Sequence, residues 1–158
     1  MGVFYLIFNM YRITINGLSN LTKNLGGVET ASNAIFKNAM DQSLTAVTNI
    51  AKANSPFKTG KLRRSIHPIM KNVLEGQVST GTEYAKYVEE GTRPHVIVPK
   101  RAKVLAFKVG GSMVFARRVN HPGFAGRWYM KKSGQQSVNV VKGIYERAFS
   151  KLVHVIFN

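Results

Sequence analysis

The chain has 158 residues, a length that suits one domain with a hydrophobic core. Its 44% of hydrophobic residues argues against disorder of the whole chain, and the absence of cysteine excludes a disulfide framework and a thiolate zinc site. The formal net charge is +16, from 23 Lys and Arg against 7 Asp and Glu, so polyanions or acidic protein surfaces are the favoured partners.

The N-terminal residues predict strands followed by a short helix. The apolar run Phe4 to Phe8 and the alternating segment Tyr11 to Ile15 are both typical of strands. Asn16-Gly17 is a turn signal, and leucines at 18, 21 and 25 have helical spacing that Gly26-Gly27 ends. No positive segment precedes the first run, and no run approaches the roughly 20 apolar residues of a membrane span, so we expect neither a signal peptide nor a membrane contact.

A long amphipathic helix is predicted from Val28 to Ala53. Apolar residues recur there at steps of three and four, with Gln42 as the one polar member of the stripe. The stripe comprises Val28, Ala31, Ile35, Ala39, Gln42, Ala46, Ile50 and Ala53, widened by Phe36, Met40, Val47 and Ala51. Pro56 ends the helix. We expect this helix to pack the core, and a partner-binding helix is the alternative.

The middle of the chain predicts a helical turn and two strands. Thr59 can cap the turn Lys61 to Arg64. Ser65 to Met70 and Val73 to Thr80 are typical of strands, and either Asn72 or Glu75-Gly76 can supply the reversal between them.

Short elements follow. Tyr84 to Glu90 is compatible with a helix that Gly91 stops. Val96 to Val98 predicts a brief strand, and Val104 to Val109, Gly110-Gly111 and Met113 to Ala116 together have the pattern of a hairpin. Asn120 to Gly123 has the residues of a turn.

The chain ends with a predicted helix from about Ser137 to Ile156, with Ser137 as a possible cap. These elements predict an α+β fold, in which one long helix of the N-terminal half and the C-terminal helix pack a small, mostly antiparallel sheet with hairpins. No repeat, linker or low-complexity tract interrupts the sequence, so we expect residues 1–158 to form a single domain.

The residues that catalysis or metal binding requires are scarce. None of His67, His95, His121 and His154 has the spacing of a metal motif, and two imidazoles near the hairpin are too few ligands for a metal ion. The adjacent acids Glu89 and Glu90 would point to different faces of a helix. No glycine pair precedes the Lys-Ser/Thr of a phosphate loop. We therefore expect no catalytic residues, no metal and no cofactor. The chain is expected to be a binding or structural protein, not an enzyme.

The segment between Glu90 and Glu146 contains no acid but many basic residues, namely Arg93, Lys100, Arg101, Lys103, Lys108, Arg117, Arg118, Arg127, Lys131, Lys132 and Lys142. It is either a solvated basic face or a face turned toward DNA or an acidic partner. Phe107, Phe115 and Trp128 lie among these cations and could stack on bases. The favoured interpretation places them on the inner face of the hairpin and the edge of the sheet, since alternation puts Leu105 and Phe107 on one face.

Several motifs in sequential order resemble one family. They are Ser-Pro-Phe-Lys-Thr-Gly-Lys-Leu-Arg-Arg-Ser-Ile at residues 55–66, Tyr-Ala-x-Tyr-Val-Glu-x-Gly-Thr at 84–92, Arg-Pro-His-x-Ile-x-Pro-Lys at 93–100, Leu-x-Phe at 105–107, Val-Phe-Ala at 114–116 and Val-x-His-Pro-Gly at 119–123. Together they resemble the tail-component family of long-tailed bacteriophages related to the minor tail protein Z of phage lambda. Arg127 to Met130 and Glu90 depart from the family's usual residues.

The resemblance implies an α+β structural protein of the virion that is found in the host cytoplasm during assembly. It implies a position at the head–tail junction, in a homo-oligomeric ring that follows the sixfold symmetry of the tail. The partners it implies are the head connector or head-closure protein and the tail terminator or tail tube protein, with nonspecific DNA contact in the lumen. A free, sequence-nonspecific nucleic-acid-binding protein is the alternative.

Two groups of residues are the candidate sites within this assembly. The first is a subunit or partner contact loop with Arg93, His95, Lys100 and Arg101, which Pro94 and Pro99 stiffen. The second is a basic lumen or interface group that comprises Lys108, Arg117, Arg118, His121 and Arg127. A surface loop with only a folding role is the alternative for the first group.

Overall fold

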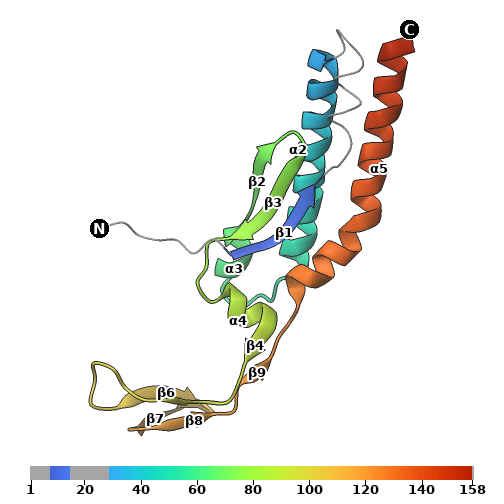
Figure 1. Ribbon diagram of the computed structural model, residues 1–158. Coiled ribbons are helices and arrows are strands. Elements are labelled where there is room, and N and C mark those ends of the chain that lie inside the picture. The colour runs from blue at the N-terminus through green and yellow to red at the C-terminus, as the bar shows by residue number, and fades with distance from the viewer. Residues whose placement is uncertain (1–7, 15–28, 158) are drawn as a thin grey trace. The chain divides into compact units, whose positions relative to one another are not determined.

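The computed structural model describes residues 8–14 and 29–157 (Figure 1). The chain divides into two compact units. The large unit comprises the described residues up to Ala85 and from Trp128 onward, and the small unit is Lys86–Arg127. The expected single domain over 1–158 stays a prediction. The expected helix with leucines at 18, 21 and 25 and the strand residues at 4–7 lie outside the described residues.

The large unit contains a three-stranded antiparallel sheet. Its strands are β1 (Phe8–Thr14), β2 (Ile66–Asn72) and β3 (Glu75–Thr80), in the order β1-β3-β2. The reversal between β2 and β3 occurs at Asn72, whose Oδ1 accepts a hydrogen bond of 2.8 Å from the Leu74 amide. The sequence predicted this hairpin and left the reversal open between Asn72 and Glu75-Gly76, and the structure has it at Asn72. Val73 and Leu74, predicted as strand, form the turn.

Helix α2 (Glu29–Asn54) packs on one face of this sheet. A Cβ built on Gly76 of β3 would lie 2.8 Å from a methyl carbon of Leu44 and 3.0 Å from the Met40 sulfur, so helix and strand meet without room for another side chain. The helix agrees with its predicted range, but its buried face is rotated. Gln42 is exposed. The interior comprises the four residues predicted to widen the stripe (Phe36, Met40, Val47 and Ala51), Ala39 of the stripe itself, Leu44, and three small polar residues, Ser32, Ser43 and Thr48.

Helix α5 (Tyr129–Phe157) runs along α2 (Figure 1). Phe36 of α2 stacks on Tyr145 at a centroid distance of 6.4 Å and meets Phe149 edge-on at 5.2 Å. The Tyr145 hydroxyl points to the Met40 sulfur at 3.8 Å. These contacts join the two helices into one core with Ala39, Ile144, Ala148 and Leu152.

The predicted start of the last helix at Ser137 is wrong, because α5 begins eight residues earlier. Ser137 is buried inside the helix and donates to the Gly134 carbonyl at 2.8 Å, so it is no cap. Small residues let α2 and α5 approach here, and Asn54 donates to the Ser133 hydroxyl at 2.9 Å and to Gln136 at 2.7 Å. Tertiary packing therefore makes a polar, glycine-containing segment helical against its weak propensity.

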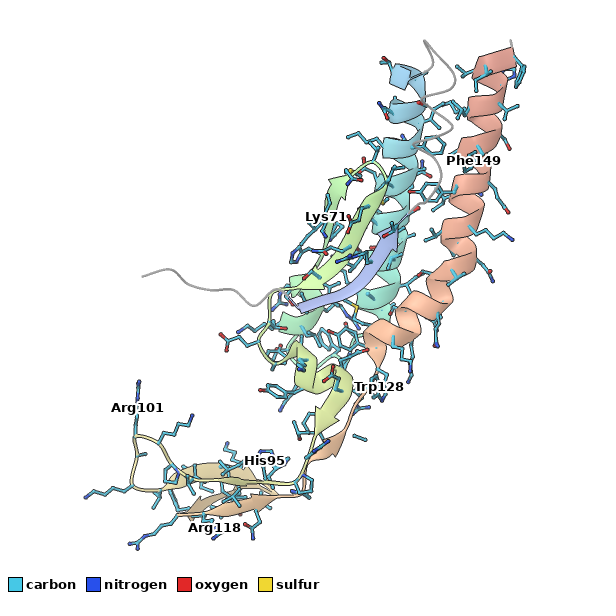
Figure 2. The ribbon with its side chains drawn as sticks, viewed as in Figure 1. Lys71, His95, Arg101, Arg118, Trp128 and Phe149 are labelled. Atoms are coloured by element: carbon cyan, nitrogen blue, oxygen red, sulfur yellow. The ribbon has the colours of Figure 1, made fainter. Side chains whose placement is uncertain are left out.

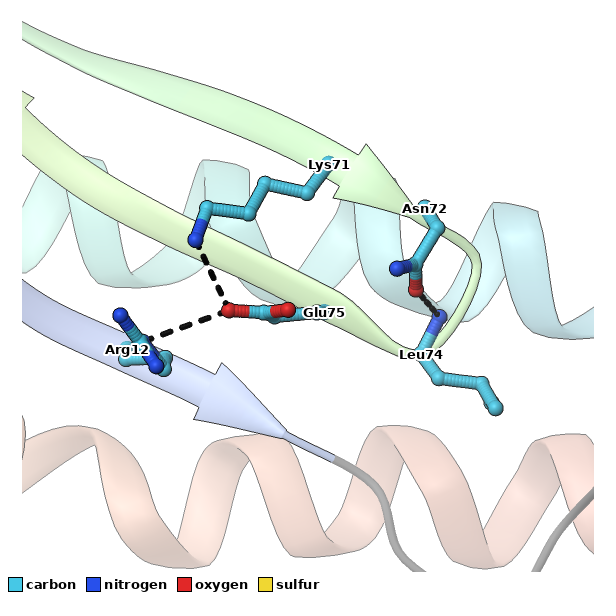
Figure 3. A network of polar contacts seen from close by, with 5 residues as sticks. All are labelled: Arg12, Lys71, Asn72, Leu74 and Glu75. Atoms are coloured by element: carbon cyan, nitrogen blue, oxygen red, sulfur yellow. Dashed lines mark hydrogen bonds and ion pairs between the residues drawn. The ribbon is translucent and has the colours of Figure 1, made fainter.

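Glu75 joins the three strands of the sheet on one side (Figure 3). Its Oε1 lies 3.0 Å from the Lys71 Nζ of β2 and 3.3 Å from the Arg12 Nε of β1. The hydrogen bond from Lys71 lowers the pKa of the Glu75 carboxyl below its usual 4.5, burial opposes this shift, and the charges of Lys71 and Arg12 add to it. The three charges thus hold the edge strands to β3.

The small unit is built from short ladders around one hairpin. Helix α4 (Ala85–Glu90) leads into it, and Gly91 stops the helix with a φ of 85° as predicted. Three antiparallel pairs follow: β4 (Gly91–Thr92) with β9 (Phe124–Ala125), β5 (His95–Ile97) with β8 (Val119–His121), and β6 (Leu105–Val109) with β7 (Ser112–Ala116). The α+β class with hairpins and two packing helices is confirmed.

Candidate contact surface of the small unit

The glycine junction, defined as Gly91, Gly123 and Gly126, brings two backbone segments of the small unit into close contact. A Cβ on Gly91 would lie 2.3 Å from the Phe124 carbonyl oxygen, and one on Gly123 would lie 2.2 Å from that of Thr92. A Cβ on Gly126 would lie 2.2 Å from the Glu89 carbonyl oxygen. No side chain fits these gaps, so only glycine permits the β4–β9 pairing. The Arg127 amide, which donates to the Val88 carbonyl at 2.8 Å, closes the pairing.

The structure brings together one pair from the two predicted groups, His95 and His121. They are directly opposite on β5 and β8, and their rings stack with centroids 5.0 Å apart. His95 Nδ1 donates to the Arg93 carbonyl at 2.8 Å, whereas His121 Nδ1 accepts from the Gly123 amide at 3.0 Å. The two bonds require different tautomers of the two imidazoles. Each bond fixes the backbone next to its strand, before His95 and after His121.

The β6–β7 hairpin has two unlike faces. Gly110 and Gly111, with φ values of 57° and 92°, form its two-residue turn. Its register pairs Phe107 with Val114 and Ala106 with Phe115, so the two phenylalanines lie on opposite faces. Phe107 is half-buried, whereas Phe115 is 66% exposed. The expected inner position is therefore wrong for Phe115.

Trp128, also expected to be packed inside, is 44% exposed. Its backbone has a φ of 53°, and the Lys131 ammonium lies 5.4 Å from the centre of its ring. Its carbonyl accepts a hydrogen bond of 2.9 Å from the Lys132 amide in the first turn of α5. The residue therefore directly precedes α5 rather than packing the edge of the sheet.

The proposed contact-loop residues are all at the surface of the small unit. Arg93, His95, Lys100 and Arg101 are exposed, and Arg101 extends from the connection between β5 and β6 (Figure 2). In the second group His121 is half-buried, and four residues are exposed: Lys108, Arg117, Arg118 and Arg127. Within these groups the structure shows the imidazole pair and the bond from the His95 side chain to the Arg93 carbonyl.

The sequence missed one feature, the open apolar face of the hairpin, defined as Ala106, Lys108, Met113 and Phe115. Phe115 is 66% and Met113 is 50% exposed on β7, and their cross-strand partners Ala106 and Lys108 are exposed on β6. The sequence contained enough information to predict this face. A two-residue turn at Gly110-Gly111 sets the register of the two strands, and this register places Phe107 and Phe115 on different faces.

The motif at residues 55–66 has a folding role in the large unit. Gly60 precedes α3 (Lys61–Ser65) with a φ of 74°, and the Thr59 hydroxyl accepts a long bond of 3.4 Å from the Lys61 amide instead of forming the predicted cap. Arg63 donates to the Ser55 carbonyl at 3.3 Å, and its guanidinium lies 5.1 Å from the centre of the Phe57 ring. Leu62 and Ile66 are buried in the same turn. The motif therefore joins the end of α2 to β2.

The described residues contain no group of three or more His, Cys, Asp or Glu that could hold a metal ion. A groove of about 510 Å³ between α2 and α5 is lined by apolar side chains with Asn38, Gln42, Arg147 and Lys151, and the described lining includes no carboxylate. Within the same ranges, no helix combines the length and apolar character that crossing a membrane requires.

Comparison with known proteins gives one match. Residues 19–91 match the HK97-gp10-like family model, described as "Bacteriophage HK97-gp10, putative tail-component". Neither the curated proteins nor the solved structures contain a significant match. The matched range includes the motif at 55–66 and ends at Gly91, so most of the small unit lies beyond it. Residues 19–91, somewhat less than half of the chain, are therefore similar to the HK97-gp10-like family of bacteriophage tail components.

Proposed function

We propose that this chain is a structural protein at the head–tail junction of a tailed bacteriophage or prophage-derived particle, where it joins the head connector to the tail tube. The observation that carries this proposal is the family match over residues 19–91, because it supports a tail-related structural protein of the virion. The structure adds that the shared motif at 55–66 makes packing and backbone contacts, as a structural role requires.

In this proposal the chain forms a homo-oligomeric ring, with six copies to follow the symmetry of the tail. A closed ring requires each subunit to offer two different surfaces to its neighbours. The head connector or head-closure protein binds on one side of the ring, and the tail terminator or tail tube protein binds on the other. The contact loop with Arg93, His95, Lys100 and Arg101 serves one of these contacts.

The basic residues are suited to a ring around the path of the DNA. The net charge of +16 and the acid-free segment between Glu90 and Glu146 would attract phosphate without reading sequence. Lys108, Arg117, Arg118 and Arg127 are exposed and able to reach such a lumen. His121 is half-buried, so its role in this proposal is to position its neighbours.

Deletion of the gene from a producing genome tests the proposal. The expected particles are full heads and separate tails that do not join, and the wild-type chain supplied in trans restores complete particles. A Gly81→Ala chain should restore them equally, because a Cβ at Gly81 meets nothing within 4 Å. Normal, firmly joined tails in the deletion would contradict the proposal.

One observation favours the alternative of a free nucleic-acid-binding protein, namely the high positive charge with the acid-free segment. This alternative predicts DNA binding by the purified chain that weakens steeply as salt rises. Absence of binding at low salt would exclude it. A basic ring lumen would also bind DNA weakly, so the deletion phenotype decides between the two functions.

A further inference from the structure

The small unit has almost no interior of its own. Within residues 86–127, all of which the structure describes, Glu89 is the only residue classed as buried. The large unit, in contrast, buries aromatic and aliphatic side chains such as Phe36, Met40 and Leu152 almost completely. Short two-stranded ladders are marginally stable in water without a packed face. The small unit therefore has apolar surface available to pack against another molecule.

This surface is concentrated on the hairpin and the connection before it. Phe115 and Met113 lie on the open apolar face, and Val109 at the turn is 56% exposed. Val98 and Val104 flank the β5–β6 connection and are 55% and 37% exposed. Exposed apolar residues that are scattered singly need no explanation, but several on one hairpin are typical of an interaction site.

The charges around this surface select the partner. Lys108 is opposite Met113 on the same face, and Arg117 and Arg118 follow β7 directly. Residues 91–127 contain no Asp or Glu. The same face of a second copy would bring Lys108, Arg117 and Arg118 against their own counterparts, so an acidic partner is electrostatically favoured at this face.

The apolar side chains distinguish a protein partner from DNA. Duplex DNA presents phosphates to an approaching surface, and these would satisfy Lys108 but leave Met113 and Phe115 without apolar contacts. A protein interface combines an apolar centre with a polar rim. The hairpin has this arrangement, with Phe115 and Met113 at the centre and cations beside them.

We propose that the open apolar face docks on a partner protein of the particle whose surface has an apolar strip bordered by Asp and Glu. This inference rests on the proposed function, because it takes the partner from the assembled particle. It adds the surface of the small unit that makes the contact and the chemistry of the protein that receives it. Phe115 is the central anchor, and Arg117 and Arg118 supply charge at the rim.

Photo-crosslinking in assembled particles tests this inference. A benzoylphenylalanine replaces Phe115 in one variant and Phe57 in a control, because Phe57 is 68% exposed but lies in the large unit. The particles are purified, irradiated and analysed by mass spectrometry. The expected crosslink from position 115 joins one other virion protein at an apolar site with Asp and Glu nearby, and position 57 does not give this product.

Each other outcome overturns part of the account. A crosslink from position 115 to a second copy, to DNA or to no molecule would overturn the docking proposal while the chain remains a particle protein. Absence of the chain from purified particles would overturn the proposed function as well. With the crosslinked partner purified, Phe115→Ser should raise the Kd at least tenfold and Phe57→Ser should leave it unchanged. Equal Kd values for both variants would also overturn the docking proposal.

Discussion

His95 and His121 are directly opposite on β5 and β8, with their rings stacked at a centroid distance of 5.0 Å. Each imidazole also bonds to the backbone two residues away, one as a donor and the other as an acceptor. The pair therefore fixes one end of the ladder, where the segment with Arg93 enters it and the turn at Gly123 leaves it.

Replacement of His121 by Phe should loosen this turn. The variant keeps a ring for stacking but removes the acceptor of the Gly123 amide, and one such hydrogen bond contributes about 1 kcal/mol net. We expect hydrogen exchange of the Gly123 amide to become about fivefold faster. His67→Phe is the control, since its imidazole is exposed on β2 in the large unit. An unchanged exchange rate in the His121 variant would contradict the role of this bond.

Alanine at Gly123 or Gly91 should open the glycine junction. Both residues have positive φ values, 79° and 85°, and their Cβ atoms would lie within 2.3 Å of backbone oxygens. The left-handed conformation alone costs about 1–3 kcal/mol for another residue. We expect trypsin to cleave these variants between Lys100 and Arg118 at least tenfold faster than it cleaves the wild type. The Gly81→Ala variant should be cleaved at the wild-type rate. Equal cleavage of all variants would show that the junction tolerates a side chain.

Tyr145 should make the stability of the large unit sensitive to alkaline pH. Burial raises the pKa of its hydroxyl from 10 to about 12. Its contribution is therefore complete below about pH 10, where the unfolded chain still holds the proton, and is lost as pH rises through 12. An ultraviolet titration should show a late tyrosine step that becomes smaller by one residue in Tyr145→Phe. The same late step in both proteins would contradict this assignment.

Glu75 should have the opposite dependence, at the acid end. Its pKa lies below 4.5, so its contribution is complete above that value and is lost as pH falls through the lowered pKa. A carbon NMR titration should place the Glu75 midpoint below the usual value of 4.5. Arg12→Gln should move the Glu75 midpoint upward. A Glu75 midpoint at or above 4.5 would be inconsistent with the network of Figure 3.

Phe36→Ala should destabilise the large unit strongly. Phe36 is 1% exposed and contacts both Tyr145 and Phe149, and truncation of such a ring leaves a cavity that costs about 3–5 kcal/mol. Phe57→Ala, at a ring that is 68% exposed, should cost less than about 1 kcal/mol. Urea denaturation measures both changes. Similar losses in the two variants would contradict the helix pairing.

Periodicity predicted the elements with strong local signals. The long helix and the Gly110-Gly111 hairpin agree with their predicted positions, and the β2–β3 reversal is at Asn72, one of its two predicted positions. Hydrophobic spacing and turn residues determine these elements locally. The fold class followed from these elements. The site residues of the small unit were placed on a polar surface from charge alone, and their roles stay a prediction.

Contacts between distant residues account for what the sequence could not predict. The start of α5 depends on Asn54, which is 79 positions before Ser133 in the sequence. The buried face of α2 differs from the predicted one because Gly76 leaves space for Leu44 and Met40 against the sheet. Small polar residues such as Ser43 are also buried, although hydrophobic periodicity predicts them to be exposed. The tight backbone approach at Gly91 and Gly123 has no local hydrophobic pattern.

The most direct test of the central claim is a cryo-electron microscopy map of the neck of purified particles that carry this chain. The account predicts density for α2 and α5 in repeated copies around the DNA at the head–tail junction. It also predicts that the hairpin with Phe115 contacts a different protein. Complete, infectious particles whose junction contains no density for the chain would contradict the account.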